Sequence, residues 1–193
     1  MVKALVVVAH PDDETIWMGG KILREKNWGW TIVSLCRKDD PDRRPKFFKV
    51  CSMLGARGFM SDLDDDHPEK RLDGLDEVVR RIEPIAMDKK FDYVFTHGEN
   101  GEYGHNRHIE VNAAVKAMAE GGLIDCEHLF EFSYRRLEGP FRCVPELGSN
   151  EVFALSEAEF EKKKSLVNDV YGFSKQSFEY ISCCAHEPFN KVI

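Results

Sequence analysis

The feature that most constrains this chain is an apolar run, Ala4–Val8, followed at once by the polar segment AHPDDE at positions 9–14. A continuous run of branched apolar residues is typical of a parallel strand that is buried on both faces. Such strands belong to α/β sheets, in which ligands bind in the crevice at the carboxyl ends of the strands. The sequence therefore predicts an α/β fold with a site directly after its first strand.

The polar segment carries one imidazole and three carboxylates, which is more than the start of a helix requires. A helix is predicted from Glu14 to Lys26, and acidic side chains in its first turn interact favourably with the helix dipole. The dipole explains one or two carboxylates but not the histidine beside them. His10 and Asp13 provide a nitrogen and an oxygen donor close together in the chain, which indicates part of a metal site.

A second polar segment, GHNRHIEV at positions 104–111, follows the predicted strand Phe91–Phe95 through a loop rich in Gly and Asn. Its two histidines, His105 and His108, share a face if a helix begins here. Zinc in catalytic sites typically keeps three protein ligands and one open position for water. Together with the earlier nitrogen and oxygen donors, one of these two histidines would complete such a set.

Hydrophobic periodicity and turn residues predict further elements in alternation along the chain. We expect strands at Trp30–Cys36, Phe91–Phe95 and Cys126–Tyr134, and helices at Arg44–Leu54, Leu75–Met87, Val111–Met118 and Ser156–Tyr171. Pro84 should interrupt or kink the helix in which it lies. The predicted fold is α/β, with a Rossmann-like, mainly parallel sheet and helices on both faces. No GxGxxG motif follows the first strand, so dinucleotide binding has no support.

The length of 193 residues, 42% of them hydrophobic, fits one globular domain over residues 1–193 with a sizeable core. The sequence contains no recognisable signal segment and no apolar stretch long enough to span a bilayer. The six cysteines form no CxxC pair, so we expect buried free thiols in a soluble, cytoplasmic protein. A formal net charge of −7 argues against nucleic acid or an anionic membrane as the main partner. The formation of homo-oligomers stays open.

The two polar segments, together with Gly19-Gly20 and Tyr103, resemble the LmbE/PIG-L family of zinc-dependent N-deacetylases, which act on N-acetylglucosamine derivatives. Weaker similarity covers Arg44–Gly55, LDG at positions 72–74, and Lys164 with Tyr171, so the resemblance extends over most of the chain. The first segment is highly specific, whereas the second is specific only in combination with it.

This resemblance implies a role for several residues. One zinc ion per chain, or another divalent transition metal, would be held by His10, Asp13 and His108. The other site residues would be Asp12 as the general base, His105 as the oxyanion stabiliser, and Tyr103 and Asp73 beside the substrate. The implied partner is a small amino sugar or glycoconjugate. Family members often carry Asp where this chain has Arg107, so the partner of His105 is left unassigned.

Three other polar positions have a structural interpretation beside a functional one. In the charged loop 37–44, Arg44 or Arg43 could reach the rim of the site and hold a substrate hydroxyl or anion, although a solvated connection is commoner. The acidic run 61–67 lacks the glycine and glutamate that an EF-hand needs, so we expect a solvated loop. His97 is expected to be a hydrogen-bonded structural histidine.

Other functions remain open from the sequence. The first polar segment could be a capped helix that binds no metal. A non-catalytic, receiver-like signalling module would bind Mg²⁺ through oxygen atoms alone, whereas His10 and His108 suit zinc. Another zinc amidohydrolase would cleave a different N-acyl substrate, such as an N-acyl amino acid.

Overall fold

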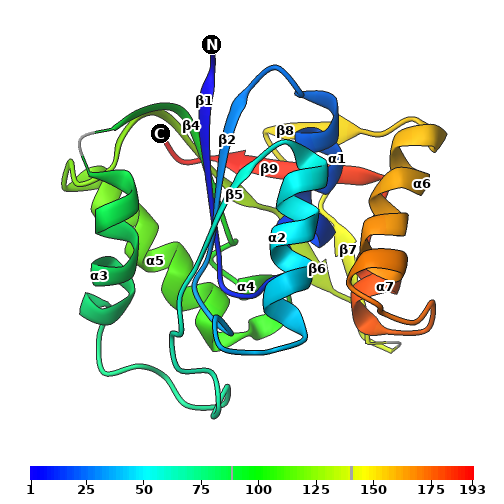
Figure 1. Ribbon diagram of the computed structural model, residues 1–193, viewed down its shortest axis with the longest axis horizontal. Helices are drawn as coiled ribbons and strands as arrows, with labels where there is room; N and C mark the ends of the chain where they lie inside the picture. The colour runs from blue at the N-terminus through cyan, green and yellow to red at the C-terminus, as the bar shows by residue number, and fades with distance from the viewer. Residues whose placement is uncertain (88, 140) are drawn as a thin grey trace.

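A central sheet organises the computed structural model, which describes residues 1–87, 89–139 and 141–193. Its seven strands follow the order β3-β2-β1-β4-β5-β9-β8 (Figure 1). The parallel strands are β1 (Lys3–Val8), β2 (Gly29–Ser34), β3 (Arg57–Met60), β4 (Lys90–Thr96) and β5 (Asp125–Phe132). Two antiparallel strands, β9 (His186–Lys191) and β8 (Glu151–Ala154), extend one edge. The predicted Rossmann-like, mainly parallel sheet is confirmed.

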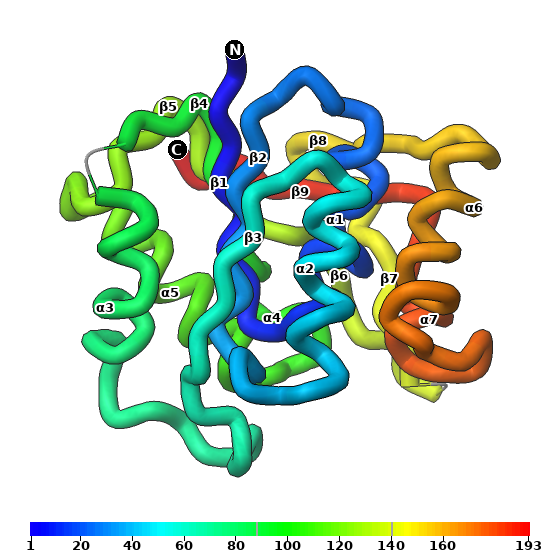
Figure 2. Tube along the Cα trace, viewed as in Figure 1, coloured from blue at the N-terminus to red at the C-terminus, as the bar shows by residue number. Residues whose placement is uncertain are grey.

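Helices lie on both faces of this sheet, as Figures 1 and 2 show. One side carries α3 (Asp76–Ala86) and α5 (Asn106–Glu120), and the other carries α1 (Asp13–Arg24) and α2 (Arg43–Leu54). Because side chains alternate along a strand, β1 supplies both hydrophobic cores. Val6 belongs to the core that contains Trp17 of α1, while Val7 belongs to the core that contains Val111 of α5. All four side chains are buried, which explains the unbroken apolar run.

The remaining elements lie mostly in the C-terminal region, for which few elements were predicted. A capping box of Ser156 and Glu159 starts α6 (Glu157–Ser165), at the point where the sequence predicts a helix to begin. The other elements are α4 (Gly101–Gly104), β6 (Tyr134–Arg136), β7 (Cys143–Pro145), the π-helical turn η1 (Leu166–Val170) and α7 (Phe178–Ser182). Pro84 lies within the last turn of α3, which ends two residues later, so it does not interrupt the body of that helix. Every helix in the described part of the chain is too short or too polar to span a bilayer.

Helix α1 is braced by the C-terminal region through groups inside the helix. The buried carboxylate of Glu187 accepts hydrogen bonds from the backbone N–H groups of Gly20 (2.8 Å) and Lys21 (2.7 Å). It also pairs with the buried ammonium of Lys163 at 2.8 Å. The hydroxyl of Tyr134 donates to the carbonyl of Trp17 at 2.7 Å. These contacts fix the helix that follows the first polar segment.

The sheet order also explains where the two polar segments meet. Strands β1 and β4 are neighbours, and the chain continues from β1 toward β2 and from β4 toward β5 on opposite sides. The carboxyl ends of two such strands border the crevice in which ligands bind in open α/β sheets. Segment 9–14 leaves β1 here, and segment 97–108 leaves β4 beside it.

Candidate metal and catalytic site

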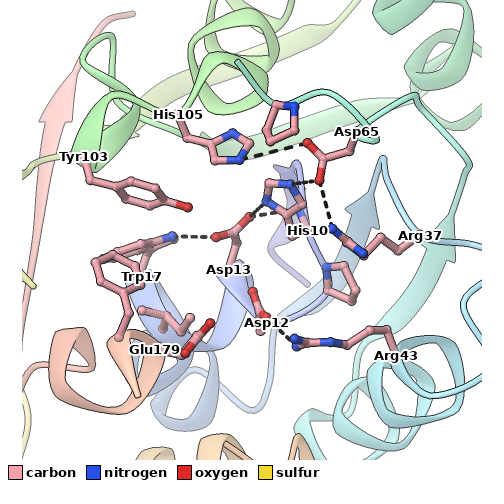
Figure 3. A pocket seen from close by; sticks show the side chains of 14 residues that line it. His10, Asp12, Asp13, Trp17, Arg37, Arg43, Asp65, Tyr103, His105 and Glu179 are labelled. Atoms are coloured by element: carbon pink, nitrogen blue, oxygen red, sulfur yellow. Dashed lines mark hydrogen bonds and ion pairs between the residues drawn. The ribbon is translucent and has the colours of Figure 1, made fainter. Parts of the chain in front are cut away.

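A cavity of about 280 Å³ opens at this edge of the sheet (Figure 3). Its lining comes from five parts of the chain: the start of α1, the loop from β2 into α2, the loop after β3, the segment from α4 into α5, and α7. The lining residues are His10, Pro11, Asp12, Asp13, Ile16, Trp17, Arg37, Arg43, Asp65, Pro68, Tyr103, His105, Phe178 and Glu179. His108 lies fully buried against this lining.

Three donor atoms converge at the floor of the cavity. His10 Nδ1 lies 3.2 Å from Asp13 Oδ2 and 3.1 Å from His108 Nε2. The third separation, between His108 Nε2 and Asp13 Oδ2, is 3.4 Å. Tetrahedral bonds of about 2.1 Å place ligand atoms roughly 3.4 Å apart, so these three atoms suit one zinc-sized ion.

The hydrogen-bond partners of the two histidines determine which ring nitrogens face the centre. His108 Nδ1 contacts Glu102 Oε2 at 2.5 Å, and His10 Nε2 contacts Asp65 Oδ2 at 3.1 Å. A carboxylate only accepts hydrogen bonds, so each of these nitrogens carries a hydrogen and the opposite nitrogen presents a lone pair. Two lone pairs and a carboxylate oxygen then face one another, which is a stable arrangement only around a cation. The residues present therefore fit a bound metal.

Three other groupings of donors in the described part of the chain also bring their atoms within 4.8 Å, namely His10 with His105 and His108, His10 with Cys36 and Asp65, and Asp13 with His97 and His108. In the second, burial raises the pKa of the Cys36 thiol and so disfavours the thiolate that a metal needs. Hydrogen bonds oppose the other two. His97 Nε2 accepts from the Ala9 N–H at 2.9 Å, and its Nδ1 contacts Glu102 Oε2 at 2.9 Å. Both nitrogens of this buried histidine are therefore used within the protein, as expected for a structural residue. His105 Nδ1 accepts from the Arg107 N–H at 3.2 Å at the start of α5, which leaves the hydrogen on Nε2. His105 is thus a donor toward the cavity, and its Nε2 lacks the lone pair that a metal needs.

The electrostatics of the donor set also favour a cation. Burial disfavours the charged form of His10, but hydrogen bonds to Asp13 and Asp65 outweigh it and raise the pKa of His10 to about 10. Without a metal a proton therefore occupies Nδ1, and a bound ion would take the place of that proton. Burial likewise opposes ionisation of Asp13, yet the surrounding histidines, His108 and His97 foremost, hold the pKa of Asp13 well below its usual range. Asp13 Oδ1 accepts the indole N–H of Trp17 at 2.9 Å, which leaves Oδ2 directed at the centre.

Glu102 is a buried carboxylate that sequence reasoning missed. It accepts from both His97 and His108, and its Oε1 accepts the Gly98 N–H at 2.8 Å. Burial disfavours its charge, but the two histidines lower the pKa of Glu102 to about 2. Its backbone has a φ of 58°, which is uncommon outside glycine and costs on the order of 1 kcal/mol or more. This strained conformation turns the carboxylate inward to hold both rings.

Asp12, predicted as the general base, also has a strained backbone, with a φ of 137°. Its Oδ2 accepts from Arg43 Nη1 at 2.8 Å, and its side chain lines the cavity beside the donor set. Burial and the nearby charge of Asp13 raise the pKa of Asp12 well above its usual range, against the opposing charge of Arg43. The carboxylate is therefore held in place and binds a proton more readily than an exposed aspartate.

His105 and Tyr103 lie on the opposite side of the cavity from Asp12 (Figure 3). Burial and the neighbouring His108 and His10 lower the pKa of His105 to about 3, so the ring is neutral. The ring of Tyr103 packs edge-on against His105, with centroids 5.7 Å apart, and against Phe178 at 4.7 Å. The structure thus places both predicted residues on the cavity wall.

Two residues expected near the substrate lie elsewhere, namely Arg44 and Asp73. Both are exposed, and neither is part of the cavity lining. Helix α2 begins at Arg43, and successive helical residues point about 100° apart, so Arg43 faces the cavity while Arg44 packs over Phe48. Asp73 follows Leu72, whose N–H is held by Glu110 of α5, and this contact leaves Asp73 on the outside of its loop.

Several lining residues were not expected to belong to the site. Asp65 comes from the acidic run that the sequence suggested was a solvated loop, and Arg37 comes from the charged loop after β2. Phe178 and Glu179 come from α7, in the region that the sequence left unassigned. Hydrophobic periodicity cannot identify such residues because each reaches the cavity through tertiary packing.

Fold and site together define an α/β protein with a candidate metal site of two histidines and one carboxylate at the carboxyl ends of its parallel strands. The family model described as "PIG-L: GlcNAc-PI de-N-acetylase" matches residues 5–119, and the chain belongs to this family. This agrees with the resemblance carried by the two polar segments.

Two curated relatives are a little over a quarter identical to this chain across the aligned residues. The 1D-myo-inositol 2-acetamido-2-deoxy-alpha-D-glucopyranoside deacetylase of Corynebacterium diphtheriae is 27% identical over 160 residues, covering 61% of this chain and 52% of the relative. The N-acetylglucosaminyl-phosphatidylinositol de-N-acetylase of Bos taurus is 29% identical over 137 residues, covering 63% and 52%. The chain therefore spans about half the length of the curated relatives it matches.

Solved structures share the fold at lower identity. The 4-carboxy-2-hydroxymuconate hydratase of Pseudomonas putida has a TM-score of 0.69 at 17% identity, covering 100% of this chain and 97% of that one. The N,N'-diacetylchitobiose deacetylase of Pyrococcus horikoshii has a TM-score of 0.66 at 17% identity, covering 98% and 83%. A hydratase and a deacetylase thus share this fold, and the fold alone does not identify the reaction.

Proposed function

We propose that this protein is a metal-dependent hydrolase that removes the N-acetyl group from an N-acetylglucosamine-type sugar or glycoconjugate and releases acetate. The observation that carries the proposal is the convergence of His10 Nδ1, Asp13 Oδ2 and His108 Nε2 beside the carboxylate of Asp12. Family membership and the deacetylase names of the curated relatives support the substrate class. We further propose that residues 1–193 act as one domain.

Zinc is the proposed ion, although another divalent transition metal suits the same ligands. Imidazole nitrogen suits zinc, copper, iron and nickel, whereas magnesium prefers oxygen ligands. Two histidines in the donor set therefore disfavour a receiver-like, magnesium-binding module. When bound, zinc would polarise the acetyl oxygen and lower the pKa of a water from about 15.7 toward about 7.

The protein's own residues divide the remaining work. Asp12 accepts a proton from the attacking water and returns it to the leaving amine, and its raised pKa suits both steps. Arg43 holds this carboxylate by one oxygen, Oδ2. His105 directs its Nε2–H into the cavity, where it donates to the negative oxygen of the tetrahedral intermediate. Tyr103, Trp17 and Phe178 form an aromatic wall that excludes water from one side.

Two other reactions are distinguished by experiment, namely cleavage of a different N-acyl amide and hydration of a carbon–carbon double bond. The similar size and fold of the hydratase motivate the second. Acetate release should be measured with N-acetylglucosamine, N,N'-diacetylchitobiose, an N-acetylglucosaminyl-inositol and several N-acyl amino acids, with an unsaturated 2-hydroxy acid tested for hydration. Each assay is run with zinc and with a chelator.

The proposal predicts chelator-sensitive acetate release from at least one amino sugar, with an equal amount of free amine. Release from N-acyl amino acids alone would identify the rival amidohydrolase. Hydration without acetate release would refute the deacetylase assignment. Zinc re-addition after chelation should restore turnover, which separates metal loss from unfolding.

A further inference from the structure

Asp65 differs from the acidic residues around it. Its side chain is only 8% exposed, whereas Asp64 and Asp66 beside it are exposed residues. It lines the cavity at the floor next to His10, as Figure 3 shows. A buried carboxylate is costly unless its oxygens are matched by donors, so its position needs an explanation.

The two oxygens of this carboxylate have different surroundings. Oδ2 accepts from His10 Nε2 at 3.1 Å and from Arg37 Nη2 at 3.2 Å. Oδ1 has no hydrogen-bond partner among the described residues, and it lies 4.0 Å from His105 Nε2. His105 carries its hydrogen on that nitrogen, because its Nδ1 accepts from the start of α5. The free oxygen is therefore the nearest acceptor toward which the ring of His105 can be oriented.

The loop that carries Asp65 is tied to the helix of the site histidines. Arg107, 1% exposed, donates to the carbonyl of Asp64 and, at 3.0 Å, to the carbonyl of Lys70. It also pairs with Glu110 at 2.7 Å, one turn along α5. A buried guanidinium with several planar contacts is a rigid support. These contacts hold Asp65, the residue after Asp64, over the cavity floor.

We propose that Asp65 is a positioning residue for both histidines: its Oδ2 orients His10 so that Nδ1 faces the metal, and before substrate binds its Oδ1 orients the Nε2–H of His105, which then donates to the substrate oxygen instead. The inference about His10 stands on the metal centre alone, while the part about His105 rests on the proposed function. Carboxylates that accept from a metal-binding histidine fix its ring orientation and tautomer, and their loss typically costs about 10- to 100-fold in metal affinity or activity.

A structural alternative is that Asp65 serves only as a surface partner of Arg37. Substitution of Asp65 distinguishes a role in orienting the two histidines from a role as the partner of Arg37 alone. Asp65→Asn keeps the size and shape of the side chain but removes its charge and places an amide N–H₂ at one oxygen position. Asp66→Asn is the matched control, because this exposed neighbour contributes nothing to the cavity lining.

The decisive experiment measures zinc affinity by competition with a chromophoric chelator, with thermal melting to verify folding. Asp65→Asn should weaken zinc binding by about 10- to 100-fold, while Asp66→Asn should stay within about two-fold of wild type. At saturating zinc, kcat of Asp65→Asn for acetate release should fall by about 10-fold, since the Nε2–H of His105 is no longer oriented before the substrate binds.

Equal zinc affinity of the two variants would overturn the proposal and reduce Asp65 to the partner of Arg37. The affinity comparison needs no substrate, so it decides the proposal even if wild-type protein hydrolyses no N-acetyl sugar. That latter result would refute the proposed function separately.

Discussion

The parallel half of the molecule, residues 3–120 with four of the five parallel strands, and the C-terminal region, residues 125–193 with the fifth, contribute to the site in different ways. The parallel half provides the three converging donor atoms, the Asp12 carboxylate and the His105 donor. The C-terminal region provides two lining residues from α7 and the contacts that brace α1. The residues proposed to bind the metal and catalyse the reaction thus lie in one half of the chain, and those that brace α1 lie in the other. Substitutions should therefore affect metal binding and stability independently.

The family model covers residues 5–119, which corresponds closely to the parallel half. Reacting groups require fixed positions at strand ends, and these positions depend on local sequence. The C-terminal region acts through packing and the cavity wall, where different residues can serve. The comparison therefore predicts that changes in the first half alter metal binding and turnover, while changes in the second alter stability and substrate affinity.

The largest effect is expected from loss of a metal ligand. His108→Ala removes one of three donors and should abolish tight zinc binding together with activity. His105→Ala is the matched control from the same helix start, and it should keep about one zinc per chain because its Nε2 carries a hydrogen. Metal analysis of both purified variants tests this pair. Full zinc in His108→Ala with loss in His105→Ala would reverse the assignment.

A large effect on stability, without one on metal binding, is expected from the C-terminal brace. Lys163→Met leaves the carboxylate of Glu187 buried without its ammonium partner. Breaking a buried ion pair costs about 3 to 5 kcal/mol of unfolding free energy. Lys164→Met, on the same helix and partly exposed, should change it by less than about 0.5 kcal/mol. Urea unfolding measures both, and lost zinc affinity in folded Lys163→Met would argue against the separation.

A smaller change in metal affinity is expected at Glu102. Both histidines contact Oε2 of Glu102, and Oε1 accepts from the Gly98 N–H, so Glu102→Gln must place an amide N–H₂ against either the two rings or another N–H. Zinc affinity should fall by about 10- to 100-fold, as for other carboxylates that support a ligand histidine. Glu99→Gln, an exposed change in the same loop, should leave affinity near wild type. Comparable affinities for the two variants would show that Glu102 is not needed to orient His108.

The smallest effect is expected on the aromatic wall. Phe178→Ala removes a ring that packs on Tyr103 at 4.7 Å and lines the cavity. Aromatic contacts contribute about 0.5 to 1.5 kcal/mol, so KM should rise about 2- to 10-fold with little change in kcat. The control is Leu147→Ala, which truncates an exposed side chain away from the cavity lining. A fall in kcat with unchanged KM would place Phe178 in the chemistry instead.

The fold and the meeting of the three candidate donor residues could be predicted because their signals are local. The run Ala4–Val8 indicates a buried strand, and His10, Asp13 and His108 stand directly after strands or in a first helical turn. The supporting carboxylates could not be predicted in this way. Asp65 and Glu102 act through the paths of their loops, which no periodic pattern records.

The substrate side was less predictable for equally physical reasons. Whether Arg43 or Arg44 faces the cavity depends on the residue at which α2 begins. Sequence alone leaves the start of a helix uncertain by one or two residues. Strand β9 has the sequence HEPFNK, whose polar and apolar residues do not alternate, because Glu187 is buried to bind α1. A strand that buries a charged residue lacks the apolar pattern by which strands are predicted from sequence.

The central claim is that the parallel half binds the metal and also uses Asp12 to move a proton. Asp12→Asn preserves shape and hydrogen bonding, but an amide cannot accept the proton of water. Zinc stoichiometry and kcat for acetate release should be measured on the same preparation. We predict about one zinc per chain with kcat reduced by about 10² to 10⁴. Turnover within a few-fold of wild type, or loss of zinc, would contradict this role for Asp12.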